Sequence, residues 1–266
     1  MLYFVGIDIG STSIKIAIID KNGELIALNE SPTGSRFNQN AIDALISLLA
    51  KNDIEEKNIS YTVSTGYGRR LFKKSDENIN EITANAMGAK FQQNGYGKIR
   101  TIINVGGQDT KVISLTEDGD VKNFVMNDKC AAGTGRFLDM AARNLEVDIE
   151  ELGDLHFEAH DSPLPVNSTC AVFAESEIIS LLAAGHKKSE IVSGIHYSIA
   201  RRITRLAGRI GMEDGVVFDG GAALNSGMAN ALENELMRKV YIQPQPQFTT
   251  AIGTAHIAKT KYLKNE

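Results

Sequence analysis

The sequence predicts an α/β protein made of two similar halves, each of which begins with a β-meander and then adds helices. Two observations lead to this prediction. Alternating apolar runs interrupted by a short glycine turn occur twice, as "DIGSTSIKI" and "NVGGQDTKV", and the second starts 96 residues after the first. Four pairs of residues match at this offset: Asp8 with Asn104, Gly10 with Gly106, Thr12 with Gln108, and Lys15 with Lys111. A repeat at a fixed offset indicates a duplicated unit.

The first half is expected to contain four strands and two helices. Strands are predicted over 2–9, 13–20, 24–29 and 59–64, with a hairpin turn at Lys21-Asn22-Gly23. Apolar residues at helical spacing predict a helix over 37–51, and a second helix is predicted over 81–93.

The second half repeats the strand, glycine turn and strand, and then becomes mainly helical after Val125. "AAGTGRFLDMAARNL" reads as a glycine-rich helix entry, and "TCAVFAESEIISLLAAG" as a helix that Gly185 ends. A longer helix is predicted over 189–210, followed by strand, Gly-Gly turn and helix in "GVVFDGGAALNSGMANALENEL". We expect a first lobe over 1–98, completed by a C-terminal helix over 250–266, and a second lobe over 99–249.

Composition narrows the class of protein. The 266 residues carry a net charge of −5, which argues against a nucleic-acid-binding protein. Apolar runs stay well short of the ~18 residues that a membrane helix needs, and the N-terminus lacks a signal-peptide pattern. We therefore expect a cytoplasmic protein without a membrane partner. Two cysteines in a reducing compartment favour buried hydrophobes, reactive thiols or metal ligands over a disulfide.

Three glycine turns follow predicted strands and suit a phosphate-containing ligand. They are Gly10-Ser11-Thr12, Gly106-Gly107-Gln108 and Gly220-Gly221-Ala222. Glycine lets backbone N–H groups approach a phosphate oxygen without a Cβ in the way. The sequence has neither the P-loop pattern nor the G-x-G-x-x-G fingerprint. A bound nucleotide is therefore expected to be gripped by paired turns.

These segments resemble a known superfamily. "DIGSTSIK", "NVGGQDTK" and "VVFDGGAALNSG" resemble the first phosphate loop, second phosphate loop and adenosine loop of the actin-like ATPases. "NDKCAAGTGRFL", "STCAVFAESEI" and "IGTAHIA" narrow the resemblance to the activator ATPases of 2-hydroxyacyl-CoA dehydratases, which are related to the ATPase subunits of benzoyl-CoA reductase. The resemblance spans residues 3–262. It implies a two-lobed fold of duplicated ribonuclease-H-like domains with a nucleotide cleft.

The resemblance also implies an activity and its cofactors. Family members are homodimers that share one 4Fe-4S cluster through two cysteines per subunit, here Cys130 and Cys170, both expected at helix N-termini. Two thiolates per chain become the four ligands that such a cluster requires. The implied function is ATP-dependent donation of one electron, received from ferredoxin or flavodoxin, to a partner iron–sulfur enzyme such as a dehydratase.

The same matching assigns nucleotide-binding roles. Residues implied to contact ATP or ADP are Ser11, Thr12, Lys15, Gly106, Gly107, Gly133, Gly220, Gly221, Ala222 and, more weakly, Gln247. Asp8 is the candidate carboxylate for Mg²⁺, through water, and Gln108 the candidate for orienting the attacking water. One residue departs from the superfamily pattern, because Asn104 stands where an acid is usual at the start of the second phosphate loop. This puts tight magnesium binding and fast hydrolysis in doubt unless Asp109 substitutes.

Other interpretations remain open at this point. A small-molecule kinase would need a carboxylate base, for which Asp109 is available, and an actin-like scaffold would leave the cysteines unexplained. The partner of an activator could also be a double-cubane reductase that is not a dehydratase. His156 and His160 are expected to lie solvated in a loop. The arginines of "RRITRLAGR" are expected to form a solvated or salt-bridged face, with partner docking as the alternative.

Overall fold

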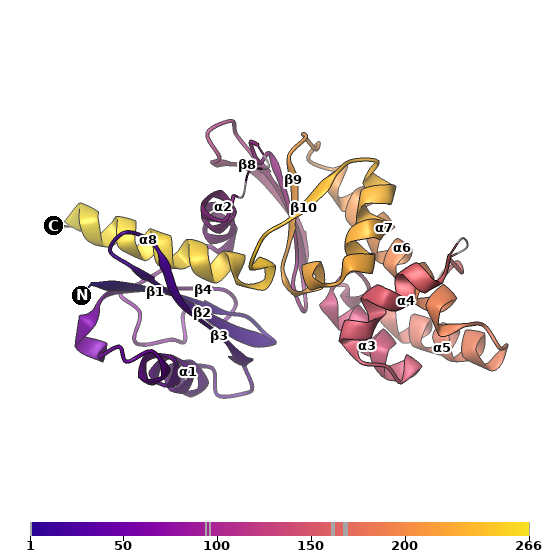
Figure 1. The fold of residues 1–266 in the computed structure, drawn as a ribbon, viewed down its shortest axis with the longest axis horizontal. Helices are drawn as coiled ribbons and strands as arrows, with labels where there is room; N and C mark the ends of the chain where they lie inside the picture. The colour runs from indigo at the N-terminus through magenta and orange to yellow at the C-terminus, as the bar shows by residue number, and fades with distance from the viewer. Residues whose placement is uncertain (1, 94, 96, 161–162, 167–169, 266) are drawn as a thin grey trace. The chain divides into compact units, whose positions relative to one another are not determined.

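The computed structural model describes residues 2–93, 95, 97–160, 163–166 and 170–265 (Figure 1). The chain divides into two compact units. Unit 1 comprises residues 1–95, 118–121 and 248–266, and unit 2 comprises residues 96–117 and 122–247. The domain boundaries expected from the sequence stay a prediction. Within the described residues, no helix is long and apolar enough to cross a membrane.

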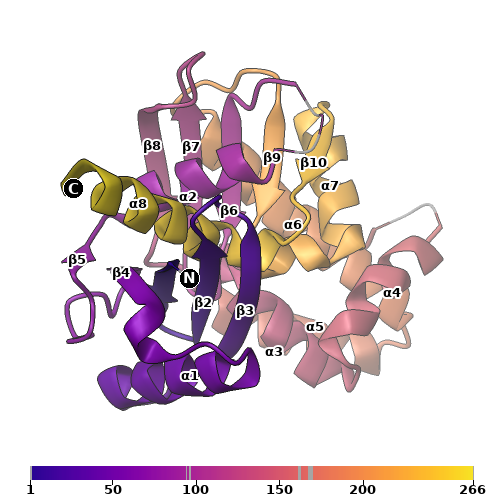
Figure 2. The same cartoon turned by 60° about the vertical axis from the view of Figure 1, so that its left-hand side comes forward.

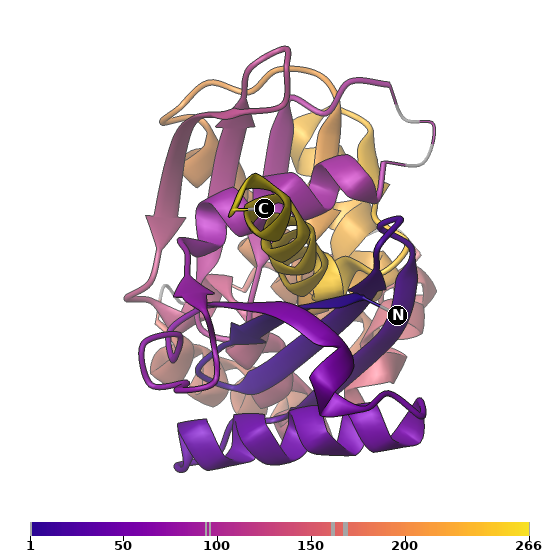
Figure 3. The ribbon, with the colours of Figure 1, turned by 90° about the vertical axis from the view of Figure 1, so that its left-hand side faces the viewer.

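Unit 1 is built on a mixed five-stranded sheet in the order β3-β2-β1-β4-β5. Its strands are β1 (Tyr3–Ile9), β2 (Ser13–Asp20), β3 (Leu25–Pro32), β4 (Ile59–Thr65) and β5 (Glu77–Asn78). Its helices are α1 (Phe37–Lys51), α2 (Glu81–Phe91) and α8 (Thr249–Asn265), with the short turn η1 (Glu56–Asn58). Strand β1 pairs antiparallel with β2 and parallel with β4. Helix α1 covers one face of the sheet and α8 lies on the other (Figure 3).

Strand β1 is buried on both faces, which explains its nearly continuous apolar sequence. Val5, Ile7 and Ile9 pack with α1, while Phe4 packs with α8. This alternation follows from the two-residue period of a strand. Gly6 points to the α8 side, where a Cβ would overlap the helix backbone. Glycine interrupts the apolar sequence of β1 at this position because the strand and α8 approach each other too closely for a side chain.

Helices α2 and α8 also cross at glycine. A Cβ on Gly253 would overlap the carbonyl oxygen of Ala84, and a Cβ on Gly88 would overlap that of Thr249. We expect Gly253→Ala to lower the free energy of unfolding by ~1–3 kcal/mol, because the two helices can make room for the added Cβ only by separating and losing packing contacts. Urea denaturation measures this as a lower midpoint at an unchanged m-value. Gly208→Ala is the control, since its Cβ would make only ordinary contacts at 3.6 Å; an equal loss in both variants would contradict the close-crossing explanation.

Unit 2 contains a second mixed five-stranded sheet, in the order β10-β9-β6-β7-β8 (Figure 2). Its strands are β6 (Thr101–Val105), β7 (Thr110–Leu115), β8 (Val121–Asn127), β9 (Val216–Asp219) and β10 (Val240–Ile242). Its helices are α3 (Gly135–Leu145), α4 (Leu152–Glu158), α5 (Ala171–Ala183), α6 (Lys188–Ala207) and α7 (Ser226–Leu236), with short turns η2 (Ala131–Gly133), η3 (Ile149–Glu151), η4 (Gly221–Leu224) and η5 (Pro246–Phe248). Helix α6 is buried along most of its length and packs against α4 and α7.

The two sheets confirm the sequence repeat at the level of register. Asp8 pairs with Lys15 across β1 and β2, and Asn104 pairs with Lys111 across β6 and β7. On its other edge, β1 pairs parallel with β4 in unit 1, and β6 pairs parallel with β9 in unit 2. The strand order of unit 2, read from β8 to β10, therefore matches that of unit 1 from β3 to β5.

Some predicted elements differ from the structure. The helix predicted over 189–210 ends as α6 at Ala207, and the chain before residue 160 contains α4, which the sequence did not predict. Strands β5 and β10 are too short to show an alternating pattern. The other long elements, including the helix over 37–51, are confirmed within a few residues at their ends.

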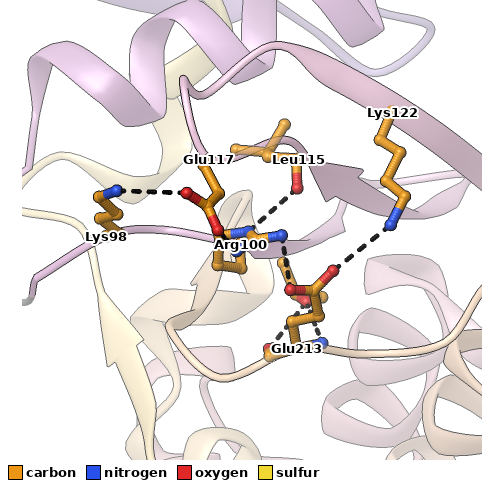
Figure 4. A network of polar contacts seen from close by, with 7 residues as sticks. Lys98, Arg100, Leu115, Glu117, Lys122 and Glu213 are labelled. Carbon is orange, nitrogen blue, oxygen red and sulfur yellow. Dashed lines mark hydrogen bonds and ion pairs between the residues drawn. The ribbon is translucent and has the colours of Figure 1, made fainter.

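One end of the unit 2 sheet carries an ion-pair network centred on Arg100 (Figure 4). Arg100 pairs with Glu213 and, at 3.8 Å, with Glu117, while its Nε donates to the Leu115 carbonyl at 3.2 Å. Lys122 lies 3.5 Å from Glu213. Because most of these side chains are solvent-exposed, the network fixes the β7–β8 end locally and adds little stability.

Candidate functional site

The first phosphate loop lies between β1 and β2 of unit 1. The Gly10 N–H donates to the Ser13 carbonyl at 3.0 Å, which closes the turn that contains Ser11 and Thr12. Thr33, which the sequence analysis missed, holds the same turn: its Oγ1 donates to the Gly10 carbonyl at 2.8 Å, and its N–H donates to the Thr12 carbonyl at 3.0 Å. The loop is therefore held both by its own backbone and by Thr33.

Two further predicted residues of unit 1 flank this loop. Lys15 lies opposite Asp8 in the sheet, and its Nζ is 2.6 Å from the Ser13 hydroxyl and 3.3 Å from Glu30. Gly66, at the end of β4, has φ of +84°, and a Cβ there would overlap the Asp8 carboxylate. The structure thus brings Asp8, Lys15 and the turn together at one end of the unit 1 sheet.

The second phosphate loop has the same geometry in unit 2. The Gly106 N–H donates to the Asp109 carbonyl at 2.9 Å, and Lys111 lies 2.7 Å from the Asp109 carboxylate. This loop also meets the N-terminus of α3. Gly135 N–H donates to the Gly106 carbonyl at 2.8 Å, and Arg136 N–H donates to the Gly107 carbonyl at 3.0 Å. Two backbone donors of the α3 terminus are thus committed to the loop that carries Gln108.

The structure identifies a carboxylate beside Asn104. The Asn104 amide donates to Asp219 Oδ1 at 2.7 Å, and Asp219 is fully buried at the end of β9. Position 219 pairs with 104 as Thr65 pairs with Asp8 in unit 1. In unit 1 the carboxylate of this pair is on the first strand (Asp8), whereas in unit 2 it is on the parallel neighbouring strand (Asp219). The sequence signal was the aspartate of "VVFDGG", which precedes a turn already singled out.

The adenosine loop follows β9. Gly220 has φ of +86°, and a Cβ there would overlap the backbone of Val105. The Gly220 N–H donates to the Pro246 carbonyl at 2.9 Å, which places the segment containing Gln247 beside the loop. Ala222 is buried, whereas a Cβ on Gly221 would meet no protein atom within 4 Å. The Gln247 side-chain oxygen is buried without a hydrogen-bond partner in the described part of the chain, which fits a ligand-facing role.

The two cysteines, both free thiols, begin different kinds of helix. Cys170 is exposed and is the N-cap of α5. Cys130 is half-buried and is the N-cap of η2, so both cysteines lie at helix N-termini as expected, although η2 is only a three-residue 3-10 helix. Asn127 clamps this cysteine, because its amide donates to the Cys130 carbonyl at 2.9 Å and its oxygen accepts the Cys130 N–H at 3.3 Å. Residues 168 and 169 of "STCAVFAESEI" lie outside the described residues.

Arg202 of α6 interacts electrostatically with both cysteines. Burial lowers the pKa of the Arg202 guanidinium, and the Cys130 and Cys170 thiols counteract this shift. One side chain is thus electrostatically coupled to both thiols. The other arginines of the predicted face, at 201, 205 and 209, are exposed, as expected, and Arg201 pairs with Glu235 at 3.4 Å. Arg202 departs from that expectation because it is half-buried.

The two cysteines of one chain would supply half of the ligands of a 4Fe-4S cluster. Such a cluster takes four thiolates, and the chain supplies two free ones near a common cation. Within the described residues, no group of three or more His, Cys, Asp or Glu side chains is placed to hold a metal ion. Half a ligand set fits a cluster shared between two copies of the chain and does not fit a complete site in one copy.

The histidine expectation requires correction. His156 lies in α4 and is buried, not solvated in a loop, while His160 is exposed. The Asn225 amide donates to His196 Nε2 at 3.1 Å, His196 and His156 meet through their Nδ1 atoms at 3.1 Å, and His156 Nε2 meets Asn230 at 3.2 Å. This chain of contacts is satisfied by two neutral imidazoles.

The electrostatics of the two buried rings agree with neutral imidazoles. Burial, reinforced by His156, lowers the pKa of His196 to about 3. Burial also lowers the pKa of His156, although the Asn230 hydrogen bond opposes this. Asn225 also caps α7 directly after the adenosine loop, because its side chain accepts the Met228 N–H. Through their contacts with Asn225 and Asn230, His156 and His196 therefore connect α4, α6 and α7 next to the adenosine loop.

The chain resembles known proteins along nearly its whole length. The sequence profile of the BadF/BadG/BcrA/BcrD ATPase family matches residues 5–258. Over 256 residues, the chain is 43% identical to the activator of lactoyl-CoA dehydratase from Anaerotignum propionicum, and the match covers 96% of each protein.

Two solved structures share the fold. One is the activator of 2-hydroxyisocaproyl-CoA dehydratase from Clostridium difficile with bound ADPNP, at 40% identity and a TM-score of 0.92 over 99% of this chain and 97% of that one. The other is component A of (R)-2-hydroxyglutaryl-CoA dehydratase from Acidaminococcus fermentans, at 38% identity and a TM-score of 0.92 over 99% of this chain and 100% of that one. The predicted actin-like ATPase fold is confirmed.

Proposed function

Because the chain belongs to the BadF/BadG/BcrA/BcrD ATPase family and its close relatives are dehydratase-activating ATPases, we propose that it is an ATP-dependent one-electron donor. Its partner is an iron–sulfur enzyme, of which a 2-hydroxyacyl-CoA dehydratase is the first choice. The physiological donor is a ferredoxin or flavodoxin.

The observation that carries this proposal is the continuity between the second phosphate loop and the Cys130 turn. The Gly133 carbonyl accepts a hydrogen bond from Thr110 at 2.5 Å, and the Gly135 N–H donates to the Gly106 carbonyl. Gly133 follows Cys130 by only three positions along the chain. A change at the phosphate loop on nucleotide binding therefore reaches the thiol through a few rigid bonds.

We assign the ATP contacts to the glycine turns. Residues proposed to bind the phosphates are Ser11, Thr12, Lys15, Gly106, Gly107, Gln108 and Gly133, and those proposed to flank the adenosine are Gly220, Gly221, Ala222 and Gln247. Asp8 is proposed to hold Mg²⁺ through water. Within unit 2, the buried Asp219 orients the Asn104 amide of the second phosphate loop. Asp109 is a weaker substitute for the missing acid, because Lys111 engages its carboxylate.

We assign one 4Fe-4S cluster per homodimer to Cys130 and Cys170 of both copies. When bound, this group supplies a one-electron carrier whose potential depends on charge and hydrogen bonding around it. Within each chain, Asn127 holds the backbone of Cys130, and the Arg202 cation opposes the negative charge that the thiolates bring. The exposed position of Cys170 leaves it accessible to a second copy.

The test uses lactoyl-CoA dehydratase as acceptor, since the relative at 43% identity is named as its activator. The anaerobically purified protein is reduced with dithionite, freed of reductant and mixed with the dehydratase. We expect the electron paramagnetic resonance signal of the reduced protein to disappear with ATP and to persist with ADP. Persistence with both nucleotides, together with phosphoryl transfer from ATP to a small molecule, would favour the kinase interpretation.

Gln108 is proposed to orient the attacking water. We expect Gln108→Ala to lower the kcat of ATP hydrolysis by roughly 10²-fold and to leave the ATP affinity nearly unchanged, because the interaction is strongest in the transition state. Steady-state phosphate release and equilibrium nucleotide binding separate the two quantities. Gln39→Ala, on the exposed side of α1, is the matched control. A lowered ATP affinity with an unchanged kcat would show that Gln108 acts only in binding.

A further inference from the structure

Thr110 differs from its counterpart in the sequence repeat. It is the first residue of β7 and pairs with Val105, whereas in unit 1 the residue that pairs with Ile9 is Ile14. Both Thr110 and Ile14 are buried, at 1% and 0% exposure. The apolar Ile14 shows that the fold does not need a hydroxyl at this position of the strand. The hydroxyl of Thr110 occurs only in unit 2, which is the unit that contains both cysteines.

The hydroxyl of Thr110 has a specific partner. Its Oγ1 donates to the Gly133 carbonyl at 2.5 Å in a buried setting. Gly133 ends the η2 turn that Cys130 begins. A buried side-chain bond of this length requires the turn and the strand to move together, because separating them leaves a desolvated carbonyl without a donor.

The Cys130 turn is rigid between its two ends. Asn127 holds the Cys130 end through both its amide and its oxygen. Thr134 folds back onto the Ala131 carbonyl with its N–H at 3.1 Å and its hydroxyl at 2.9 Å. A displacement applied at Gly133 is therefore passed to Cys130 and is not absorbed within the turn.

We propose that Thr110 is a positioning residue that couples the nucleotide state of the second phosphate loop to the Cys130 thiolate. The inference rests on the proposed function. Thr110 directly follows Asp109, whose carbonyl closes the loop by accepting the Gly106 N–H. Movement of this loop on exchange of ADP for ATP displaces the Thr110 hydroxyl, and the Gly133 carbonyl follows it. Nucleotides then shift the Cys130 environment only to the extent that they bind its alternative positions with different affinity.

The test compares Thr110→Val, which keeps the shape and removes the hydroxyl, with Thr110→Ser, which keeps the hydroxyl. The measured quantity is the rate at which bathophenanthroline removes iron from the dithionite-reduced protein with ADP or with a non-hydrolysable ATP analogue. In wild type we expect the faster of the two iron-removal rates to exceed the slower. In the valine variant we expect the ratio of the faster to the slower rate to be about fivefold smaller and close to one, and in the serine variant we expect it to remain at the wild-type value. A wild-type ratio that the valine variant retains in full would overturn the coupling role.

A second readout does not need the cluster. Hydrogen exchange of the segment 126–136 in the iron-free chain is followed by mass spectrometry with and without the ATP analogue. We expect the ATP analogue to change the exchange rate of this segment in wild type and in the serine variant, but not in the valine variant. This measurement therefore tests the coupling role even if the valine variant holds no iron. An equal change in all three chains would overturn the inference. Equal iron-removal rates in wild type itself would instead count against the proposed function.

Discussion

Replacement of either cysteine by serine is expected to abolish cluster binding. Each substitution, Cys130→Ser or Cys170→Ser, removes two of the four thiolates of a cluster shared by two copies, and the second copy has no spare ligand to offer. Within the described residues, no other metal-binding group is available as a replacement. The measurement is iron and acid-labile sulfide per chain, together with visible absorption, after anaerobic purification. The expected loss is complete.

The matched control for this prediction is Ala131→Ser, an exposed neighbour of Cys130. It introduces the same hydroxyl without removing a thiolate and is expected to retain the full iron content. ATP binding is expected to survive in both cysteine variants, because the glycine turns are intact. Full absorption and iron content in either cysteine variant would contradict the shared-cluster assignment.

Acid is expected to destabilise the protein strongly through its buried histidines. The pKa of His196 is lowered to about 3 and that of His256 to about 4, both mainly by burial. In the unfolded chain both rings bind protons below the ordinary histidine pKa of 6.5, whereas the folded chain still excludes them. Their stabilising contribution is therefore fully present above pH 6.5 and is lost as the pH falls toward 4 and then 3. Each ring contributes a slope of up to about 1.4 kcal/mol per pH unit.

Urea denaturation between pH 7 and pH 4 measures this slope. We expect His196→Gln to be less stable than wild type at pH 7, because the contacts to His156 and Asn225 are disturbed. Its free energy of unfolding should nevertheless vary less with pH, by up to about 1.4 kcal/mol per pH unit. The exposed His186→Gln is the control and should keep the wild-type slope. An unchanged slope in His196→Gln would show that this ring binds its proton equally in the folded and the unfolded chain.

The duplicated fold could be predicted because the repeat is carried by local patterns. Strand alternation and glycine turns act over a few residues, so Asp8 and Asn104 could be aligned without any tertiary information. Helix α4 was missed because it is short and its histidine is polar. His156 is buried only because His196 and Asn230, distant in the sequence, complete its hydrogen bonds.

The candidate site was predictable in its loops and not in its supporting contacts. Glycine turns after strands identify the loops directly, since the conformation demands the residue. Asp219 reaches Asn104, and Thr110 reaches Gly133, only after strands and turns have packed. Such long-range hydrogen bonds leave no periodic signal in the sequence. The half-buried position of Arg202 near both cysteines belongs to the same class.

The central claim is that the nucleotide state controls a cluster held by Cys130 and Cys170. The most direct measurement is the rate of iron removal by a chelator from the reduced wild-type protein without nucleotide, with ADP and with a non-hydrolysable ATP analogue. We predict different rates in the presence of ADP and of the ATP analogue, because the proposed function requires the two nucleotides to bind alternative positions of the second phosphate loop with different affinity. Three identical rates would contradict a nucleotide-gated electron donor.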